Sequence, residues 1–212
     1  MTVVLMATTL PTTTTTTTVA AAAPDVPRRR LGPAARRAQV LAAATVVFAD
    51  RGFTSTSIAA VAGAAGVTPR ILYRHFASKD ALYRAVLDRS LARLVGVFAV
   101  PAGRYGVDPA LLLEAGRADA DGFRVLWRHA VHEEPYRDVA ERCRADAVGC
   151  ARRGLATWTP PDALDWAARA VVGYELEAVL NWLDFGRAAD DARFARATRA
   201  ALAAGVRAWS AD

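Results

Sequence analysis

The chain of 212 residues has little of the chemistry on which redox, metal or covalent sites depend, with two cysteines, three histidines and two methionines. Cys143 and Cys150 stand seven residues apart in one predicted helix, a rise of about 10.5 Å, which excludes an internal disulfide. We predict that both are small buried residues of a cytoplasmic protein. A redox sensor is the open alternative, although only Arg142 and Arg144 stand nearby to lower a thiol pKa.

Several longer patterns are also missing. No apolar run is long enough for a membrane span, no lipidation signal is present, and no basic residue precedes Arg28 as a signal peptide requires. No phosphate-cradling glycine loop and no set of nucleophile, base and orienting residue is visible. The chain is therefore predicted to be neither an enzyme nor a membrane protein, and to need no cofactor.

Two of the histidines, His129 and His132, lie at i and i+3 beside Glu133 and Glu134, so both imidazoles could face one metal ion. A third ligand at a predictable spacing is lacking, which leaves the coordination incomplete. We predict no metal site, and we interpret these histidines as polar anchors at the edge of a ligand pocket or as ordinary surface residues.

Positive charge is concentrated in the first part of the chain. Residues 1–94 hold 12 Arg or Lys against 4 Asp or Glu, giving +8, whereas residues 95–212 hold 15 against 17, giving −2. A basic segment beside a nearly neutral remainder is typical of a protein that binds a polyanion. Double-stranded DNA is the predicted partner, with an affinity that falls steeply with salt.

Residues 1–33 have low complexity, with a threonine run at 12–18, an alanine run at 20–23 and prolines at 11, 24, 27 and 33. Such a composition does not form a packed core, so a disordered tail is predicted. Arg28, Arg29 and Arg30 form either a flexible arm that reaches a minor groove or a solvated tail.

Residues 34–82 follow the pattern of a helix-turn-helix domain. The spacing of apolar residues predicts a helix over 34–51 that ends at Gly52, and a second short helix after Thr56 and Ser57, whose hydroxyls can cap it. Gly66 supplies the sharp turn, and Thr68 followed by Pro69 begins a third helix.

Two faces are predicted for that third helix. Arg70, Tyr73 and Arg74 share one face, whereas Leu72 and Phe76 lie on another. A basic face on the second helix of such a pair is typical of insertion into the major groove. Next, Ser78 can cap a fourth helix whose start, together with the Lys79 ammonium, can hold a phosphate.

These residues together resemble the amino-terminal domain of the TetR family of transcriptional regulators. The resemblance covers residues 34–87 closely. It is carried by Gly52-Phe53, Thr56-Ser57, Val61-Ala62, Ala65-Gly66-Val67, Leu72-Tyr73, His75-Phe76 and Ser78-Lys79-Asp80-Ala81-Leu82.

The resemblance implies roles for individual residues. It implies phosphate contacts for Thr68, Tyr73, His75 and Lys79, and base contacts for Pro69, Arg70 and Arg74. Thr56 is counted with the DNA-binding residues. The open alternative is that Arg70 and Arg74 only neutralise phosphates.

Beyond the helix-turn-helix segment, residues 83–212 show helical periodicity and no convincing strand, so the fold class is all-α with about nine helices. Helices are expected at 78–97, 109–115, 121–132, 136–156, 161–185 and 191–210. The broad apolar surface of the 161–185 helix, together with the last helix, resembles the family's four-helix dimer interface, although interior packing within one subunit is the alternative.

Aromatic residues of this second domain are candidates for a ligand pocket, as the resemblance implies, or for plain core packing. The predicted ligand-binding residues are Phe123, Trp127, His129, Trp158, Trp166 and Tyr174. The predicted function is a transcriptional regulator, a repressor by family resemblance, that binds a palindromic operator as a homodimer and is released by a small-molecule effector. A constitutive or architectural DNA-binding protein without a ligand is the alternative.

Overall fold

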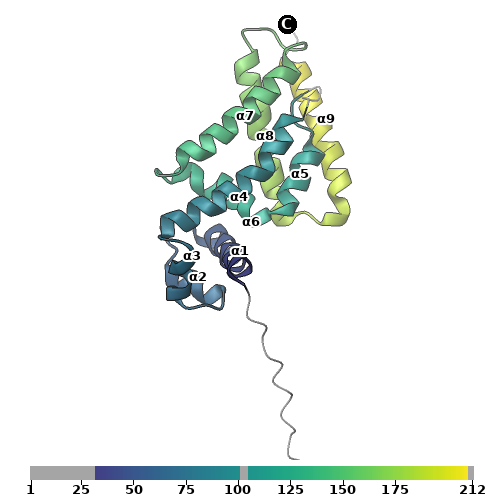
Figure 1. Cartoon of the computed structure of the whole chain (residues 1–212). Coiled ribbons are helices and arrows are strands. Elements are labelled where there is room, and N and C mark those ends of the chain that lie inside the picture. Colours follow the sequence, from purple (N-terminus) through teal and green to yellow (C-terminus); the bar gives the residue numbers. More distant parts are fainter. Residues whose placement is uncertain (1–31, 101–104, 210–212) are drawn as a thin grey trace, which may run out of the picture. The chain divides into compact units, whose positions relative to one another are not determined.

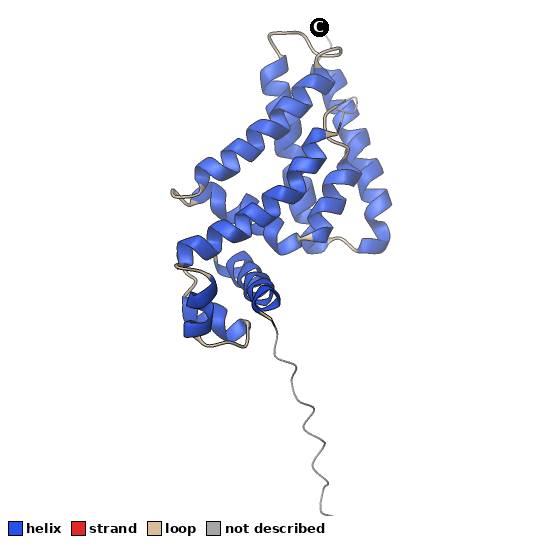
Figure 2. Ribbon diagram, viewed as in Figure 1, coloured by secondary structure: helices blue, strands red, loops and turns tan. Residues whose placement is uncertain are grey.

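The computed structural model describes residues 32–100 and 105–209, and Figure 2 shows that these ranges form helices joined by short loops. They contain nine α-helices and no β-strand, which confirms the predicted all-α class. The helices are α1 (Pro33–Arg51), α2 (Ile58–Ala64), α3 (Pro69–His75), α4 (Lys79–Ala99), α5 (Pro109–Ala118), α6 (Ala120–Arg124), α7 (Arg137–Leu155), α8 (Leu164–Phe185) and α9 (Asp191–Trp209).

Local capping signals determine the first helices. Ser57 accepts a hydrogen bond from the Ala60 amide at the start of α2, and Thr68 accepts one from the Ile71 amide at the start of α3. Gly52 has a φ of 71° at the end of α1, and Gly66 has a φ of 62° in the turn between α2 and α3. Both glycines occupy the left-handed region that other residues avoid, as the predicted turns require.

We call α1–α3 the head and α5–α9 the body. Figure 1 shows α4 running out of the head and into the body, where it passes α5, α6 and α7. Within the body, α8 packs against α5, α7 and α9. Because α4 crosses residue 82 without a break, the predicted division into domains at that point stays a prediction.

One predicted helix is interrupted. The segment predicted as a single helix over 121–132 consists of α6, a π-helical turn at Val125–His129 and a 3-10 turn at Ala130–His132. His129 Nε2 donates to the Ala49 carbonyl oxygen of α1 at 2.9 Å, so the widened turn is accompanied by a contact with the head. Such tertiary contacts override the helical periodicity of the sequence.

Some predictions concern residues outside the described ranges. The predicted disordered tail lies there except for Gly32 and Pro33, and Pro33 is the first residue of α1. The proposed arm at Arg28, Arg29 and Arg30 also lies there, as does Ser210 at the predicted end of the last helix. None of the helices within 32–100 and 105–209 has the length and apolar composition of a membrane span.

Both cysteines are buried as free thiols, as predicted. Burial raises the pKa of the Cys143 thiol to about 12, and burial also raises the pKa of the Cys150 thiol. A thiol sensor needs a lowered pKa and access to solvent, so neither cysteine suits that role.

A carboxyl group is buried in the middle of α8. Glu175 is 2% exposed, and its Oε1 atom has no hydrogen-bond partner among the described residues. Burial, with a smaller contribution from the nearby Asp108 carboxylate, raises the pKa of Glu175 from 4.5 to about 8. The folded protein therefore holds this side chain as a neutral acid at pH 7.

We predict that Glu175→Gln removes part of the pH dependence of stability. The folded state keeps a proton that the unfolded chain loses, so the stability of the wild type falls as the pH rises from about 5 to about 8 and then levels off. Thermal melting at low and high pH should therefore show Glu175→Gln more stable than the wild type only at high pH. Exposed Glu177→Gln is the control, and an equal shift at both pH values would contradict the prediction.

Candidate nucleic-acid interface

The outer face of α3 presents polar and basic side chains to solvent. Thr68, Pro69, Arg70 and Arg74 are exposed, and the large ring of Tyr73 is 51% exposed. On the inner face, Leu72 is fully buried against the core of the head. The structure thus brings these predicted DNA-binding residues together on one exposed helix.

The start of α4 provides a second polar group beside α3. Ser78 accepts a hydrogen bond from the Ala81 amide and caps the helix. The Lys79 ammonium lies 4.2 Å from the centre of the Phe53 ring and 3.4 Å from the Thr54 carbonyl oxygen. The cation is therefore held at the positive end of α4, where an anion is favoured.

Arg37, which the sequence interpretation did not single out, also belongs to this basic surface. Its guanidinium lies 4.6 Å from the centre of the Phe76 ring, so α1 places an exposed cation beside the end of α3. Gln39 of the same helix donates to the Ala65 carbonyl oxygen at 2.9 Å and supports the turn between α2 and α3. In the sequence, only its charge and its position on the outer face of α1 could have indicated that Arg37 belongs to this surface.

Two predicted DNA-binding residues are placed differently from the others. The prediction for Thr56 is corrected, because its side chain is 3% exposed and its hydroxyl donates to the Gly52 carbonyl oxygen at 2.7 Å. It closes the turn after α1. His75 is half-buried, and its Nε2 atom is buried without a partner among the described residues, so only other atoms of the ring can meet a phosphate.

The head is fastened to the body through Glu133. Its Oε1 atom accepts from the Phe53 amide at 2.6 Å, and its Oε2 atom accepts from the Tyr83 hydroxyl at 2.6 Å. A Cβ atom on Gly52 would lie 2.9 Å from Glu133 Oε1 and 2.9 Å from His129 Nδ1, so a side chain would force both groups to move, and the positive φ disfavours it as well. The turn at the end of α1 is therefore shaped to receive a carboxylate from the body.

Tyr136 extends the same junction towards the first turn of α4. Its hydroxyl donates to Asp80 Oδ1 at 2.7 Å. This hydrogen bond, together with the Arg84 guanidinium, lowers the pKa of the Asp80 carboxyl. The rings of Phe53, Tyr83 and Tyr136 meet at centroid distances of 4.5 to 5.2 Å, so aromatic contacts fill the space around the polar ones.

The six predicted ligand-binding residues do not line one cavity. Phe123 and Trp127 are buried together with ring centres 6.3 Å apart, whereas His129 binds the head. The other three residues are exposed at the surface, Trp158 at 46%, Trp166 at 47% and Tyr174 at 45%. No group of three or more His, Cys, Asp or Glu side chains in the described ranges is placed to share a metal ion.

Comparison with known proteins agrees with this geometry. The family model for bacterial regulatory proteins of the tetR family matches residues 40–86. The activator FasR of Mycolicibacterium smegmatis is 34% identical over 57% of this chain, but the match spans only 58% of FasR. The regulator Mb3439c of Mycobacterium bovis is 31% identical over 73% of this chain and 77% of its own length.

A solved structure agrees over a longer stretch. A TetR-like transcriptional regulator from Rhodococcus sp. RHA1 superimposes with a TM-score of 0.65 and 27% identity, over 82% of this chain and 99% of that one. Together with the exposed face of α3, these matches define a helix-turn-helix transcriptional regulator. Within that class, the chain belongs to the TetR family.

We predict different effects for the two kinds of DNA contact, one on α3 of the head and the other at the start of α4. Lys79→Ala should weaken binding to all duplexes alike, and it should reduce the magnitude of the salt slope by about 1 per head, because a phosphate contact is lost. Arg70→Ala should change which duplex is preferred, at a cost of about 1–3 kcal/mol on the best one, if the guanidinium reads a base.

Fluorescence titration of a duplex panel at several salt concentrations distinguishes the two effects. Arg142→Ala is a matched control, since it removes the same charge from an exposed side chain of α7 in the body. An Arg70→Ala variant with the wild-type order of preferences would reassign Arg70 to phosphate binding.

Proposed function

We propose that the protein binds a palindromic operator in double-stranded DNA as a homodimer and that a small-molecule effector controls this binding. The main support for this proposal is that Arg70, Tyr73 and Arg74 are exposed on one capped helix, next to Lys79. One head offers a short contact surface, so two heads related by a two-fold axis supply the specificity that a regulator needs.

The outer face of α8 and α9 supports the dimer. Trp166 and Tyr174 are about half exposed on α8, and Trp166 packs against Trp209 of α9 with ring centres 5.1 Å apart. Small exposed residues follow one another along α9 and permit the close approach of another helix. They are Ala197, Ala201, Ala204 and Ala208. Exposed aromatic rings beside small residues are typical of a helix-packing interface.

The effector site is proposed near Phe123 and Trp127. Trp127 Nε1 is buried and has no hydrogen-bond partner among the described residues, although a buried N–H normally has one. The ring belongs to the π-helical turn that also carries His129, which binds Ala49 of the head. A ligand that accepts a hydrogen bond from Trp127 would therefore act two residues away from a contact with α1.

The protein acts as a repressor in this proposal, as the family resemblance predicts. FasR, a relative, is named as an activator, so the sign requires its own measurement. A reporter driven by a promoter that contains the operator gives it directly. Lower expression in the presence of the protein supports repression, and higher expression supports activation.

Selection of duplexes from a random pool tests the proposed DNA recognition. The purified full chain should enrich a palindrome whose half-sites lie about one helical turn apart, because paired recognition helices enter successive major grooves. Enrichment of single half-sites would overturn the dimer. Uniform, salt-sensitive binding to every duplex would favour the architectural alternative.

The dimer predicts that Trp166→Glu separates the subunits. A charge placed on a buried interface leaves an unpaired ion, which is strongly disfavoured. Sedimentation velocity should show a monomer for Trp166→Glu and a dimer for the wild type. Trp158→Glu is the matched control, because Trp158 is equally exposed, at 46% against 47%, but precedes α8. A dimeric Trp166→Glu variant would contradict the proposed interface.

A further inference from the structure

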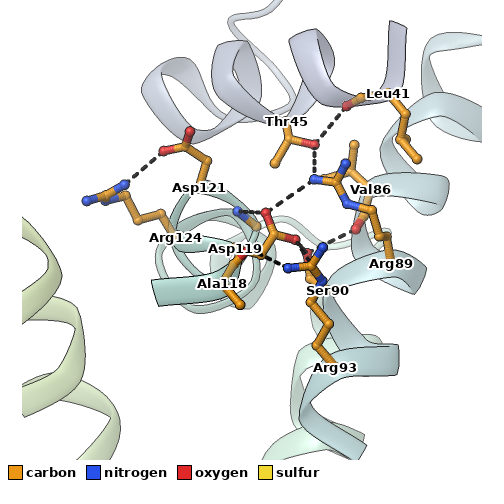
Figure 3. Close-up of polar contacts among 11 residues, drawn as sticks. Leu41, Thr45, Val86, Arg89, Ser90, Arg93, Ala118, Asp119, Asp121 and Arg124 are labelled. Carbon is orange, nitrogen blue, oxygen red and sulfur yellow. Dashed lines mark hydrogen bonds and ion pairs between the residues drawn. The ribbon is translucent and has the colours of Figure 1, made fainter. Parts of the chain in front are cut away.

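A partly buried polar bridge joins α1 of the head to α4 and to the start of α6, as Figure 3 shows. Arg89 Nη2 of α4 donates to Thr45 Oγ1 of α1 at 2.8 Å and to Asp119 Oδ1 at 3.2 Å. Thr45 is 2% exposed and donates its own proton to the Leu41 carbonyl oxygen, so its oxygen can accept from Arg89. The Arg89 guanidinium therefore adds a further tie between the head and the body, besides those of Glu133 and His129.

The Asp119 carboxylate holds the other end of this bridge. It caps α6 by accepting from the Gly122 amide at 3.3 Å, and it also accepts from the Ser90 hydroxyl at 3.3 Å. A Cβ atom on Gly122 would lie 2.4 Å from Asp119 Oδ2 and 2.2 Å from Ser90 Oγ. Only glycine permits this approach, so the first turn of α6 is seated directly against α4.

Further along, α6 is joined to α8, the helix that carries the proposed dimer face. Arg124 donates through Nε to Asp184 Oδ1 at 3.0 Å and through Nη2 to the Leu183 carbonyl oxygen at 3.1 Å. Arg128 also pairs with Asp184. Polar contacts thus connect α1, α4, α6 and α8 in sequence, from the head to the dimer face.

The Arg89 bridge is poorly explained as a contribution to the stability of the fold. The Nε atom of Arg89 is buried without a hydrogen-bond partner among the described residues, so part of the cost of burying this cation is not offset. Replacing a buried ion pair by apolar side chains is often neutral or stabilising, and a pair that is partly exposed, as this one is, stabilises less still. The bridge is better explained by the geometry that it imposes on the head.

The bridge fixes a second point on α1. Glu133 and His129 already hold the end of α1, at Phe53 and Ala49. Thr45 lies one helical turn before Ala49, a distance of about 6 Å along the axis. Apolar side chains of α1 also pack against α4 and α6. Such packing is not directional, so the hydrogen bond at Thr45 adds a fixed point that restricts the tilt of α1 about its end.

From this geometry we propose that Arg89 is a positioning residue that sets the spacing between half-sites accepted by the two heads of the dimer. Each added base pair moves the second half-site by about 3.4 Å and turns it by about a tenth of a turn. A head held at two points along α1 tolerates few such steps. The proposal rests on the proposed function, since it needs a dimer and a paired site.

The test compares the full-length wild type with Arg89→Met and Arg117→Met on duplexes that carry the selected half-sites at different spacings. Arg117 is a matched control, because its side chain is 29% exposed against 28% for Arg89 and it pairs with Asp191 entirely within the body. The expected result is at least a tenfold loss of discrimination between the best spacing and its neighbours for Arg89→Met only. The base preference within each half-site and the dimer in sedimentation should stay unchanged.

Thr45→Val is a second test variant, because it removes the acceptor on α1 and keeps the Arg89–Asp119 pair. If Arg89→Met does not fold, the spacing preference of Thr45→Val tests the proposal in its place. The proposal about Arg89 would be overturned if folded Arg89→Met or Thr45→Val kept the wild-type discrimination between spacings, or if Arg117→Met lost as much of it. The proposed dimer would be unaffected by either result. A wild type that enriches only single half-sites would overturn the proposed function itself, and the spacing role with it.

Discussion

The carboxylate of Glu133 joins the DNA-binding head to the body at the end of α1. Both of its oxygen atoms accept a hydrogen bond, one from the Phe53 amide and the other from the Tyr83 hydroxyl. A Cβ atom on Gly52 would lie only 2.9 Å from Glu133 Oε1. A buried donor that loses such a partner is costly, so the turn after α1 is complete only when the body supplies this acceptor. The head and the body therefore depend on each other for their hydrogen bonding.

The short-range features of the head could be predicted from the sequence. The hydroxyls of Ser57, Thr68 and Ser78 each accept a hydrogen bond from the amide three residues ahead and so cap the helix that follows, and a contact of that range is contained in the local sequence. The left-handed conformations of Gly52 and Gly66 are equally local. For the same reason, the exposed face of α3 emerged from spacing alone, since a helical period fixes which residues share a face.

The contacts between head and body could not be predicted in this way. Glu133 meets Phe53 across 80 positions, and Arg89 meets Thr45 across 44, so no periodic pattern links the partners. The scatter of the predicted ligand residues has a related cause. An aromatic side chain favours burial in general without specifying the place, and the structure buries Trp127 while it leaves Trp158 and Trp166 on the surface.

Lys79 has a consequence for the handling of the protein. It is the only lysine in the chain, and every other side-chain cation is an arginine. Reagents that couple or acylate side-chain amines will therefore attack the start of α4, beside the proposed phosphate contacts, and no other side chain. Immobilising the protein on a sensor surface through that amine would turn its DNA-binding face towards the support.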